Sequence, residues 1–335
     1  MTRVLIVVLN WNGADDTVDC INSLQKQSFK DFQILIVDNG SKQKDYKKLS
    51  LLKEKSNITL LRNEKNLGFA GGVNTGISYA IRNNYEFVCL FNNDATADKD
   101  WLNNLVKGFD KNESISAVTG LLLHEDGKTI DSTGDYYSIW GMPFPRSRNE
   151  PTPNAPESGY VFSASGGATL YKTNLFKEIG LFDESFFAYY EDVDISFRTQ
   201  LTGHKIYYTN DALAYHKQGA TSGKIPGFTV YQTFKNLPLL YIKNVPTSLL
   251  FPIGIRLFVL YWLFFGNAIK HGSGTPAAKG WLASIWYFWT KALWNRFYIQ
   301  SHKTVSTNYI KSLIFHDLPP DQTGMRKLRK KLTGK

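Results

Sequence analysis

Four apolar segments near the start of this chain, each ending in polar residues, restrict the fold more than any other feature. They are rich in aliphatic and β-branched residues, as expected of strands buried on both faces: VLIVVLNW (4–11), FQILIVDNGS (32–41), ITLLRN (58–63) and FVCLFNND (87–94). Segments with helical spacing of apolar residues lie between them. This alternation predicts an α/β fold with a mostly parallel sheet flanked by helices.

The polar residues at three of these strand ends are candidates for a binding site. Ligands bind open α/β sheets at the carboxyl ends of the strands. The candidates are Asn10, Asn12 and Gly13 after the first strand, Asp38 after the second, and Asn92, Asn93 and Asp94 after the fourth. Asn, Asp and Gly also end strands in ordinary turns. Three such ends on one sheet edge favour a site over turns alone.

A glycine-rich stretch, NLGFAGGVNTGISYAI (66–81), joins a strand to a helix. Glycines at such a junction let the backbone approach a phosphate, and a helix N-terminus favours anions. The spacing matches neither the dinucleotide fingerprint nor the P-loop. The alternative is a glycine-rich turn that packs closely against the sheet.

The segment FFAYYEDVDISFR (186–198) places three carboxylates directly after four aromatic residues. On a helix, Asp194 lies four residues before Arg198, the spacing of an ion pair, so we expect a structural role for it. No basic residue nearby in the sequence is placed to pair with Glu191 or Asp192, so either carboxylate is free to act as a general base. The alternative is an acidic first helical turn stabilised by the helix dipole.

Asp94 and His216 are candidate metal ligands. Asp94 ends an apolar strand, where a carboxylate suits a hard divalent cation that also binds substrate phosphates. His216 ends another apolar run and would complete the site if the two lie close in space. Each has a plainer alternative, a helix cap or turn residue for Asp94 and a buried structural histidine for His216.

The chain divides into two compositions. Residues 225–335 contain 15 Lys and Arg against two Asp, a net charge of +13, and five of the eight Trp. The remaining 24 basic and 27 acidic residues give residues 1–224 a charge of −3. We therefore predict an α/β domain over 1–224 and a separate helical, basic, aromatic-rich region over 225–335. Five prolines between positions 143 and 156 predict a loop within the first.

The C-terminal region has features of a membrane-surface segment. The apolar stretch 249–269 is interrupted by Pro252 and Arg256, which predicts that it is too short to span a bilayer. The stretch 281–299 is aromatic, with a polar face, as in helices that lie in a membrane interface, and the tail 325–335 carries six basic residues. The alternative is a soluble helical domain with an aromatic core or a dimer interface. No module in the sequence supports nucleic-acid binding.

The two cysteines, Cys20 and Cys89, lie far apart in apolar segments, and the chain has no CxxC motif. We expect no disulfide framework and no zinc site, and a reducing compartment. The N-terminal apolar run is short and lacks a small-residue cleavage site, which indicates a first strand and not a signal peptide.

Taken together and in this order, the motifs resemble glycosyltransferase family 2, and within it bacterial rhamnosyltransferase-like members. The likeness covers about residues 1–220 and is carried by NWNG (10–13), VDNGS (37–41), NLGFAGGVNTG (66–76), SGGATLY (165–171) and YYEDVD (189–194), followed by His216. The resemblance implies a GT-A fold and an inverting transfer of sugar from a nucleoside-diphosphate donor with Mg²⁺ or Mn²⁺.

The resemblance also implies roles for individual residues. Asp192 would be the catalytic base beside Glu191, and Asp94 with His216 would bind the metal. The nucleotide and diphosphate would contact Asn10, Asn12, Gly13, Asp38, Asn66, Gly72, Asn74, Asn92 and Asn93. The sugar and acceptor pocket would include Trp140, Gly166, Gly167, Tyr189 and Tyr190. Asn92 stands where the family's metal motif has its first Asp, so Asp94 is the main charged ligand.

The implied donor is dTDP-L-rhamnose, with a UDP-sugar (a hexose, N-acetylglucosamine or galactofuranose) as the alternative. We expect a saccharide on a polyprenyl diphosphate as acceptor, in cell-surface polysaccharide synthesis. The expected location is the cytoplasmic face of the cell membrane, bound peripherally to anionic lipid. Two other classes of protein compete with this interpretation: a sugar-nucleotide-binding or glycan-binding protein on a decayed transferase scaffold, and a nucleotidyltransferase, which would need a more basic phosphate-binding loop than NWNG.

Overall fold

The computed structural model describes residues 2–54, 57–217, 225–320, 322 and 326. The predicted lipid-binding tail, 325–335, lies outside the described residues except for Arg326.

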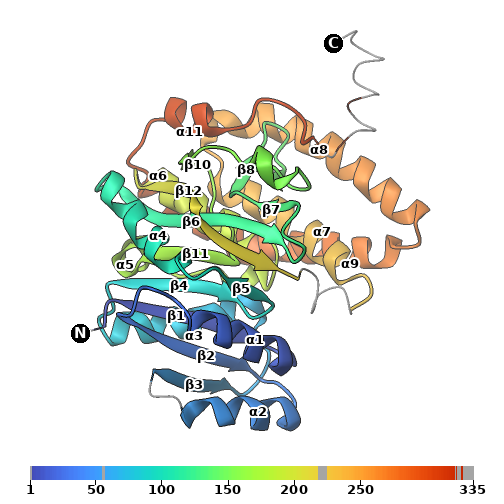
Figure 1. Ribbon diagram of the computed structural model, residues 1–335. Helices are drawn as coiled ribbons and strands as arrows, with labels where there is room; N and C mark the ends of the chain where they lie inside the picture. The colour runs from blue at the N-terminus through green and yellow to red at the C-terminus, as the bar shows by residue number, and fades with distance from the viewer. Residues whose placement is uncertain (1, 55–56, 218–224, 321, 323–325, 327–335) are drawn as a thin grey trace.

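One mixed sheet forms the centre of the molecule, with strands in the order β3-β2-β1-β4-β11-β6-β12-β10 (Figure 1). Its strands are β1 (Val4–Asn10), β2 (Phe32–Asn39), β3 (Ile58–Asn63), β4 (Phe87–Asn92), β6 (Ile115–His124), β10 (Gly159–Val161), β11 (Ala168–Lys172) and β12 (Lys205–His216). Strands β1 to β4 pair in parallel, whereas β11 is antiparallel to both of its neighbours. The expected mostly parallel sheet is confirmed.

Short strands extend the sheet around its carboxyl edge. β5 (Ala95–Ala97) pairs with the end of β12, and β7 (Ile130–Ser132) pairs with β6. β8 (Asp135–Tyr137) and β9 (Pro143–Pro145) form a separate hairpin. The proline-rich stretch, expected as a loop, therefore begins with a strand.

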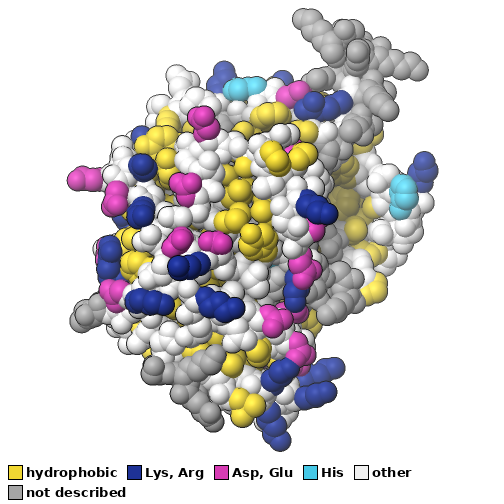
Figure 2. Space-filling view, in the orientation of Figure 1, with side chains coloured by type: hydrophobic (Ala, Val, Ile, Leu, Met, Phe, Trp, Pro, Cys, Tyr) yellow, Lys and Arg dark blue, Asp and Glu magenta, His cyan; other side chains and the backbone are white. Residues whose placement is uncertain are grey.

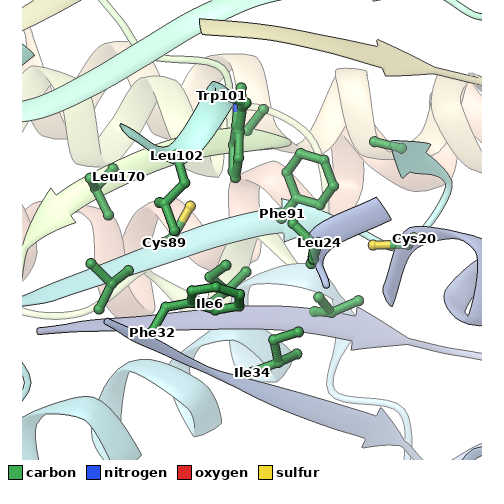
Figure 3. Close-up of a cluster of buried hydrophobic side chains, with 14 of the residues drawn as sticks. Ile6, Cys20, Leu24, Phe32, Ile34, Cys89, Phe91, Trp101, Leu102 and Leu170 are labelled. Atoms are coloured by element: carbon green, nitrogen blue, oxygen red, sulfur yellow. The ribbon is translucent and has the colours of Figure 1, made fainter. Parts of the chain in front are cut away.

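Helices cover both faces of the sheet. They are α1 (Ala14–Leu24), α2 (Gln43–Ser50), α3 (Gly68–Arg82), α4 (Trp101–Gly108), α5 (Thr173–Ile179) and α6 (Glu191–Leu201). On one face, Leu24 of α1 and Trp101 of α4 pack with Ile6 and Phe91 of the strands (Figure 3). On the other face, α3, α5 and α6 pack against the sheet through Ile77, Phe176, Ile195 and their neighbours. This double covering explains why the strands are apolar along both faces.

The C-terminal region is helical, as predicted, and shares a core with the sheet domain. Its helices are α7 (Phe228–Asn244), α8 (Thr247–Lys270), α9 (Gly274–Tyr287), a π-helical segment (Phe288–Ala292), α10 (Leu293–Ser301) and α11 (Thr307–Leu313). One buried cluster combines Val193 and Phe197 of α6 with Leu240 of α7 and Ile299 of α10. Helix α6 is thus packed from its far side by the C-terminal helices.

Helix α8 differs from the expectation that Pro252 breaks the apolar stretch. It continues through Pro252 for 24 residues, because a proline in the second turn removes only one backbone hydrogen bond. By length and composition α8 is able to cross a membrane, although a buried helix of a soluble protein passes the same test. Only 22% of the most apolar 18-residue stretch of α8 is buried, and the helix extends away from the sheet as an arm (Figure 1).

Candidate active site

A cavity of about 1000 Å³ opens at the carboxyl ends of β1 and β4. Its walls come from those strand ends, the β8–β9 hairpin, the start of β11, the segment before α6 and the start of α7. The predicted site residues that line it are Asn66, Asn92, Asn93, Asp94, Gly166, Gly167, Tyr189, Tyr190, Glu191, Asp192 and His216. The fold therefore gathers the two predicted carboxylate centres around one space.

Asp94 and His216 meet at the floor of this cavity. Asp94 follows β4 and His216 ends β12, and Oδ1 of Asp94 lies 3.0 Å from Nε2 of His216. The other ring nitrogen, Nδ1, lies 2.8 Å from Oδ2 of Asp131. Burial opposes a charged imidazole, but hydrogen bonds to Asp131 and Asp94 outweigh it and raise the pKa of His216 to about 9.

This trio has the chemistry of a divalent metal site. Asp94 offers a carboxylate oxygen and His216 an imidazole nitrogen, while Asp131 orients the ring in the way common for metal-bound histidines. Within the described ranges no group of three or more His, Cys, Asp or Glu side chains is arranged to hold a metal. Asp94 and His216 would supply two ligands, and a cation held there would take its others from water and a diphosphate.

Asp192 is held at the cavity by backbone donors. Its Oδ2 accepts from the N–H of Gly166 at 3.2 Å, and its Oδ1 accepts from the N–H of Val193 at 2.8 Å. A Cβ at Gly166 would lie 3.1 Å from the Cβ of Asp192, so only glycine lets the two segments approach this closely without displacement. Burial raises the pKa of Asp192, and these hydrogen bonds oppose the rise by favouring the ionised form.

Glu191 lies in a different environment from its neighbour. It is 6% exposed, and its Oε2 has no hydrogen-bond partner among the residues that the structure describes. Burial, followed by the nearby carboxyl of Asp192, raises the pKa of Glu191 to about 8. Near neutral pH this shift favours the protonated form of Glu191, while the backbone hydrogen bonds to Asp192 favour the ionised form of its neighbour.

Asp194 faces away from the cavity. Its Oδ2 lies 3.0 Å from the guanidinium of Arg198, which confirms the ion pair expected from the spacing. Its Oδ1 lies 2.8 Å from both Nζ of Lys243 and Nδ2 of Asn244 on α7. Asp194 thus ties α6 to the C-terminal region.

The residues predicted at the ends of β1 and β2 lie outside the cavity lining: Asn10 and Asp38 are buried, Gly13 is half-buried and Asn12 is exposed. Nδ2 of Asn10 donates to Asp38 at 3.0 Å, and Oδ1 of Asn10 accepts from the N–H of Gly13. Asn12 accepts from the backbone of Lys42. Oδ2 of Asp38 forms an ion pair with Arg62, whose Nε lies 3.3 Å away. The predicted contact of Asp38 with a nucleotide base stays a prediction.

Gly72, Asn74 and Trp140 lie away from the cavity, and packing accounts for each. A Cβ at Gly72 would lie 2.4 Å from Leu9, so this glycine lets α3 pack on β1. The amide of Asn74 bonds to both backbone groups of Phe182. Trp140 packs beside a cluster that includes Leu260 of α8. For Gly72 the structure supports the plainer of the two interpretations of the glycine-rich stretch.

The structure adds three charged residues that the sequence did not single out. Asp131, Asp135 and Arg148 all line the cavity, and Arg148 pairs with Asp131 at 2.9 Å. Asp135 is 8% exposed, and burial raises its pKa well above the usual value. The IDSTGD motif (130–135), an apolar residue followed by turn-forming and acidic residues, was a usable signal for the two aspartates. Arg148 lies in the proline-rich stretch and gave none.

The family model for glycosyl transferase family 2 matches residues 5–180, more than half of the chain. The chain belongs to glycosyl transferase family 2. This confirms the resemblance at the level of the family, whereas the narrower likeness to rhamnosyltransferases stays a prediction.

Among curated relatives of this family 2 chain, poly-β-1,6-N-acetyl-D-glucosamine synthase of Staphylococcus epidermidis is 26% identical over 208 residues, 61% of this chain and 47% of that protein. The enzyme of the same name from Staphylococcus aureus strain MSSA476 is 24% identical over 201 residues, 59% and 46% of the two chains. The chain thus spans about half the length of the curated relatives it matches.

Solved structures share the fold of this family 2 chain at lower identity. The mannosyltransferase PcManGT from Pyrobaculum calidifontis, in complex with GDP-Man and Mn²⁺, has a TM-score of 0.55 and 15% identity and covers 90% of this chain and 85% of its own. Residues 1–349 of S. aureus TarS give a TM-score of 0.54 and 16% identity, covering 89% and 90% of the two chains. At these identities the likeness concerns the fold alone.

Proposed function

We propose that this family 2 protein is an inverting glycosyltransferase that moves a sugar from a nucleoside-diphosphate donor to a hydroxyl group of a saccharide acceptor. The observation that carries the proposal is that Asp192 and the Asp94–His216 pair line one cavity. Inverting transfer needs a base on the acceptor side of the anomeric carbon and stabilisation of negative charge on the departing diphosphate. The cavity supplies candidates for both.

In the proposed reaction, Asp192 takes the proton of the acceptor hydroxyl as its oxygen attacks the anomeric carbon. The new carbon–oxygen bond forms while the bond to the diphosphate oxygen breaks, and that oxygen keeps the electron pair. Asp94 and His216 would hold a Mg²⁺ or Mn²⁺ ion, which supplies charge neutralisation to the diphosphate when bound. The half-buried rings of Tyr189 and Tyr190 would stack on a sugar face and exclude water.

Two donors are compatible with the chain. The motif resemblance favours dTDP-L-rhamnose, whereas the curated relatives are named for a polymer of N-acetylglucosamine and favour its UDP-linked form. We propose to separate them by thermal unfolding with dTDP, UDP, GDP and CDP, each with and without Mn²⁺. A ligand at about 100 times its Kd stabilises a protein by about 2.7 kcal/mol. Metal-dependent stabilisation by one nucleotide is expected; no stabilisation by any of them would refute the transferase proposal.

We also propose that the protein binds the cytoplasmic face of the membrane, where a polyprenyl-diphosphate-linked saccharide would be its acceptor. The supporting observation is the orientation of α9 and α10. Ser284 is 4% exposed, and Asn295 donates to Asp183 of the sheet domain, so these two polar side chains pack inward, whereas Lys291 is exposed. The aromatic side points outward: Trp286, Trp289, Trp294 and Phe297 are each at least 66% exposed.

Helix α8 contributes further exposed apolar side chains, which include Phe251, Phe258 and Trp262. Apolar side chains are visible behind the basic residues at the right of the space-filling view (Figure 2). Exposed aromatics on a region of net charge +13 fit an anionic lipid surface better than a neutral partner.

Flotation with vesicles tests this surface. Wild-type protein should float with vesicles that contain phosphatidylglycerol and bind pure phosphatidylcholine weakly. The triple change Trp286→Ser, Trp294→Ser, Phe297→Ser should abolish flotation, whereas Leu51→Ser with Tyr160→Ser, exposed apolar residues elsewhere, should not. Loss of a dimer in sedimentation, without any change in flotation, would instead identify this face as a dimer interface.

A further inference from the structure

The segment that leads into α6 adopts an unfavourable backbone conformation. Phe187, Tyr189 and Tyr190 have φ angles of 62°, 70° and 71°, in the left-handed region that aromatic residues rarely enter. Glu191 and Asp192 follow at once as the first residues of α6. Such a conformation persists only where surrounding groups hold it, and it often marks a functional site.

Helix α7 of the C-terminal region supplies the groups that hold this segment. Nδ2 of Asn236 lies 3.0, 2.8 and 2.9 Å from the backbone oxygens of Phe186, Ala188 and Tyr189. Three carbonyl groups of one turn therefore converge on a single carboxamide. Asn236 is fully buried, and its own Oδ1 accepts no hydrogen bond in the described part of the chain. Because only its donors are used, Asn236 is best explained by what it does for the turn.

The adjacent Lys235 strengthens the same attachment. Its Nζ donates to the backbone oxygens of Ser185 and Phe186 at 2.8 and 3.1 Å, and its side chain is 3% exposed. Burial lowers its pKa to about 8, while the nearby Glu191 opposes that shift. Lys235 and Asn236 together thus donate to the backbone oxygens of four of the five residues from 185 to 189.

Helix α7 also builds the cavity wall beside the turn. The ring of Phe228 lies 6.1 Å from those of Phe187 and Tyr189, and the hydroxyl of Tyr189 lies 3.1 Å from that of Thr229. All four side chains line the cavity. The wall opposite the strand ends is therefore made jointly by the turn and the C-terminal region.

We propose that Asn236 is a positioning residue for sugar transfer, and that its carboxamide fixes the turn so that the aromatic wall and Asp192 meet the acceptor. The inference rests on the proposed function of the cavity. Without the amide, the carbonyls of Ala188 and Tyr189 lose this donor while that of Phe186 keeps Lys235, and the turn is free to relax toward negative φ. The start of α6 would move with it. A shift of about 1 Å near a reacting group can reduce the rate by about 100-fold. The C-terminal helices then complete the site and do more than contact a membrane.

The test compares Asn236→Leu, which has a similar shape but no donor, with Gln200→Met. Gln200 is the matched control: it is 2% exposed, and its amide bonds to the backbone oxygens of Val161 and Phe162, outside the cavity. Asn236→Ser, which keeps one donor, serves if the leucine variant does not fold. Three readouts are measured on the full chain: hydrogen exchange of the peptide 186–190, thermal stabilisation by UDP or dTDP with Mn²⁺, and turnover of UDP-N-acetylglucosamine or dTDP-rhamnose. The nucleotide that stabilises the wild-type protein in the thermal-unfolding experiment above decides which pair is used.

We expect faster exchange in 186–190 and a kcat about 100-fold lower for Asn236→Leu, with nucleotide stabilisation unchanged. Gln200→Met should lose comparable thermal stability but keep wild-type kcat and wild-type exchange in 186–190. Equal kcat in wild type and Asn236→Leu would overturn the inference. That result differs from failure of the proposed function, in which Asp192→Asn itself would retain full turnover.

Discussion

Asp192 accepts a hydrogen bond from the backbone of Gly166, 26 positions earlier in the chain, and a side chain at position 166 would contact it. Gly166→Ala should therefore displace the proposed base. We expect kcat to fall by about tenfold or more with little loss of thermal stability, because the glycine has no positive φ to maintain. Gly159→Ala is the control, since its added Cβ meets nothing within 4 Å. If both variants keep wild-type turnover, the proposed contact has no role in transfer.

Replacing the carboxyl group by the corresponding amide should affect turnover differently at Glu191 and at Asp192. Near neutral pH the protonated form of Glu191 is favoured, so Glu191→Gln replaces a neutral acid by an amide of the same shape. Steady-state kinetics should show turnover within about tenfold of wild type, a smaller loss than the roughly 100-fold or more typical of a missing general base. A loss of about 1,000-fold in Glu191→Gln would assign the base to Glu191 and leave Asp192 without that role.

Metal-dependent nucleotide binding should require Asp94 and His216 together. In Asp94→Asn or His216→Gln, the additional thermal stabilisation that Mn²⁺ gives to the nucleotide complex should disappear, because each change removes one of the two ligands. His204→Gln is the control, since His204 bonds to Ser116 and Glu178 outside the cavity. An undiminished Mn²⁺ effect in both variants would place the metal elsewhere.

The free energy of unfolding should fall at low pH because of the buried Lys243, which contacts both Asp183 and Asp194. Burial alone would raise the pKa of Asp183, but Lys243 and Ser185 hold it well below its usual value. The stabilisation is therefore complete above about pH 4, the ordinary pKa of Asp, and is lost as pH falls toward the lowered pKa.

Lys243→Met should remove that dependence and cost about 3–5 kcal/mol at neutral pH, since it leaves the largely buried Asp183 without its cation, whereas Asp194 keeps Arg198. Urea unfolding between pH 2 and 7 measures both effects. Lys48→Met, at the exposed pair with Asp15, should change the free energy of unfolding by less than about 1 kcal/mol. An equal loss of unfolding free energy in the two variants would contradict the claim that burial makes the Lys243 contacts strongly stabilising.

The local patterns of the sequence were enough to predict the sheet and the strand-end positions of the polar residues. Asp94 and His216 were candidate ligands on the condition that they lie close together, and the structure meets that condition. Asp194 was expected to pair with Arg198 from helical spacing alone. The patterns failed where tertiary packing decides. The glycine at 72 serves helix packing on Leu9, and the amide of Asn74 serves a turn more than a hundred residues away.

The largest difference concerns the C-terminal region. Its composition indicated a separate unit, yet Lys235, Asn236 and Lys243 are buried against the segment around Asp192. Lysine and asparagine in an amphipathic stretch suggest a solvent-facing side. Only the fold shows that these side chains instead bond to buried carbonyl and carboxylate groups. Arg148 was missed for a similar reason, since backbone hydrogen bonds between the segments 130–133 and 146–150 bring it to its partner Asp131.

The most direct test measures the release of nucleoside diphosphate from UDP-N-acetylglucosamine, dTDP-L-rhamnose and GDP-mannose in the presence of bacterial lipid extract, for wild type and Asp192→Asn. Wild type should turn over one donor. Asp192→Asn should turn it over at least about 1,000-fold more slowly, because the base is lost. Its nucleotide-induced thermal stabilisation should equal that of wild type, because the donor site is intact. Equal turnover by the two proteins would contradict the assignment of Asp192 as the base, and stabilisation without turnover in wild type would instead indicate a sugar-nucleotide-binding protein.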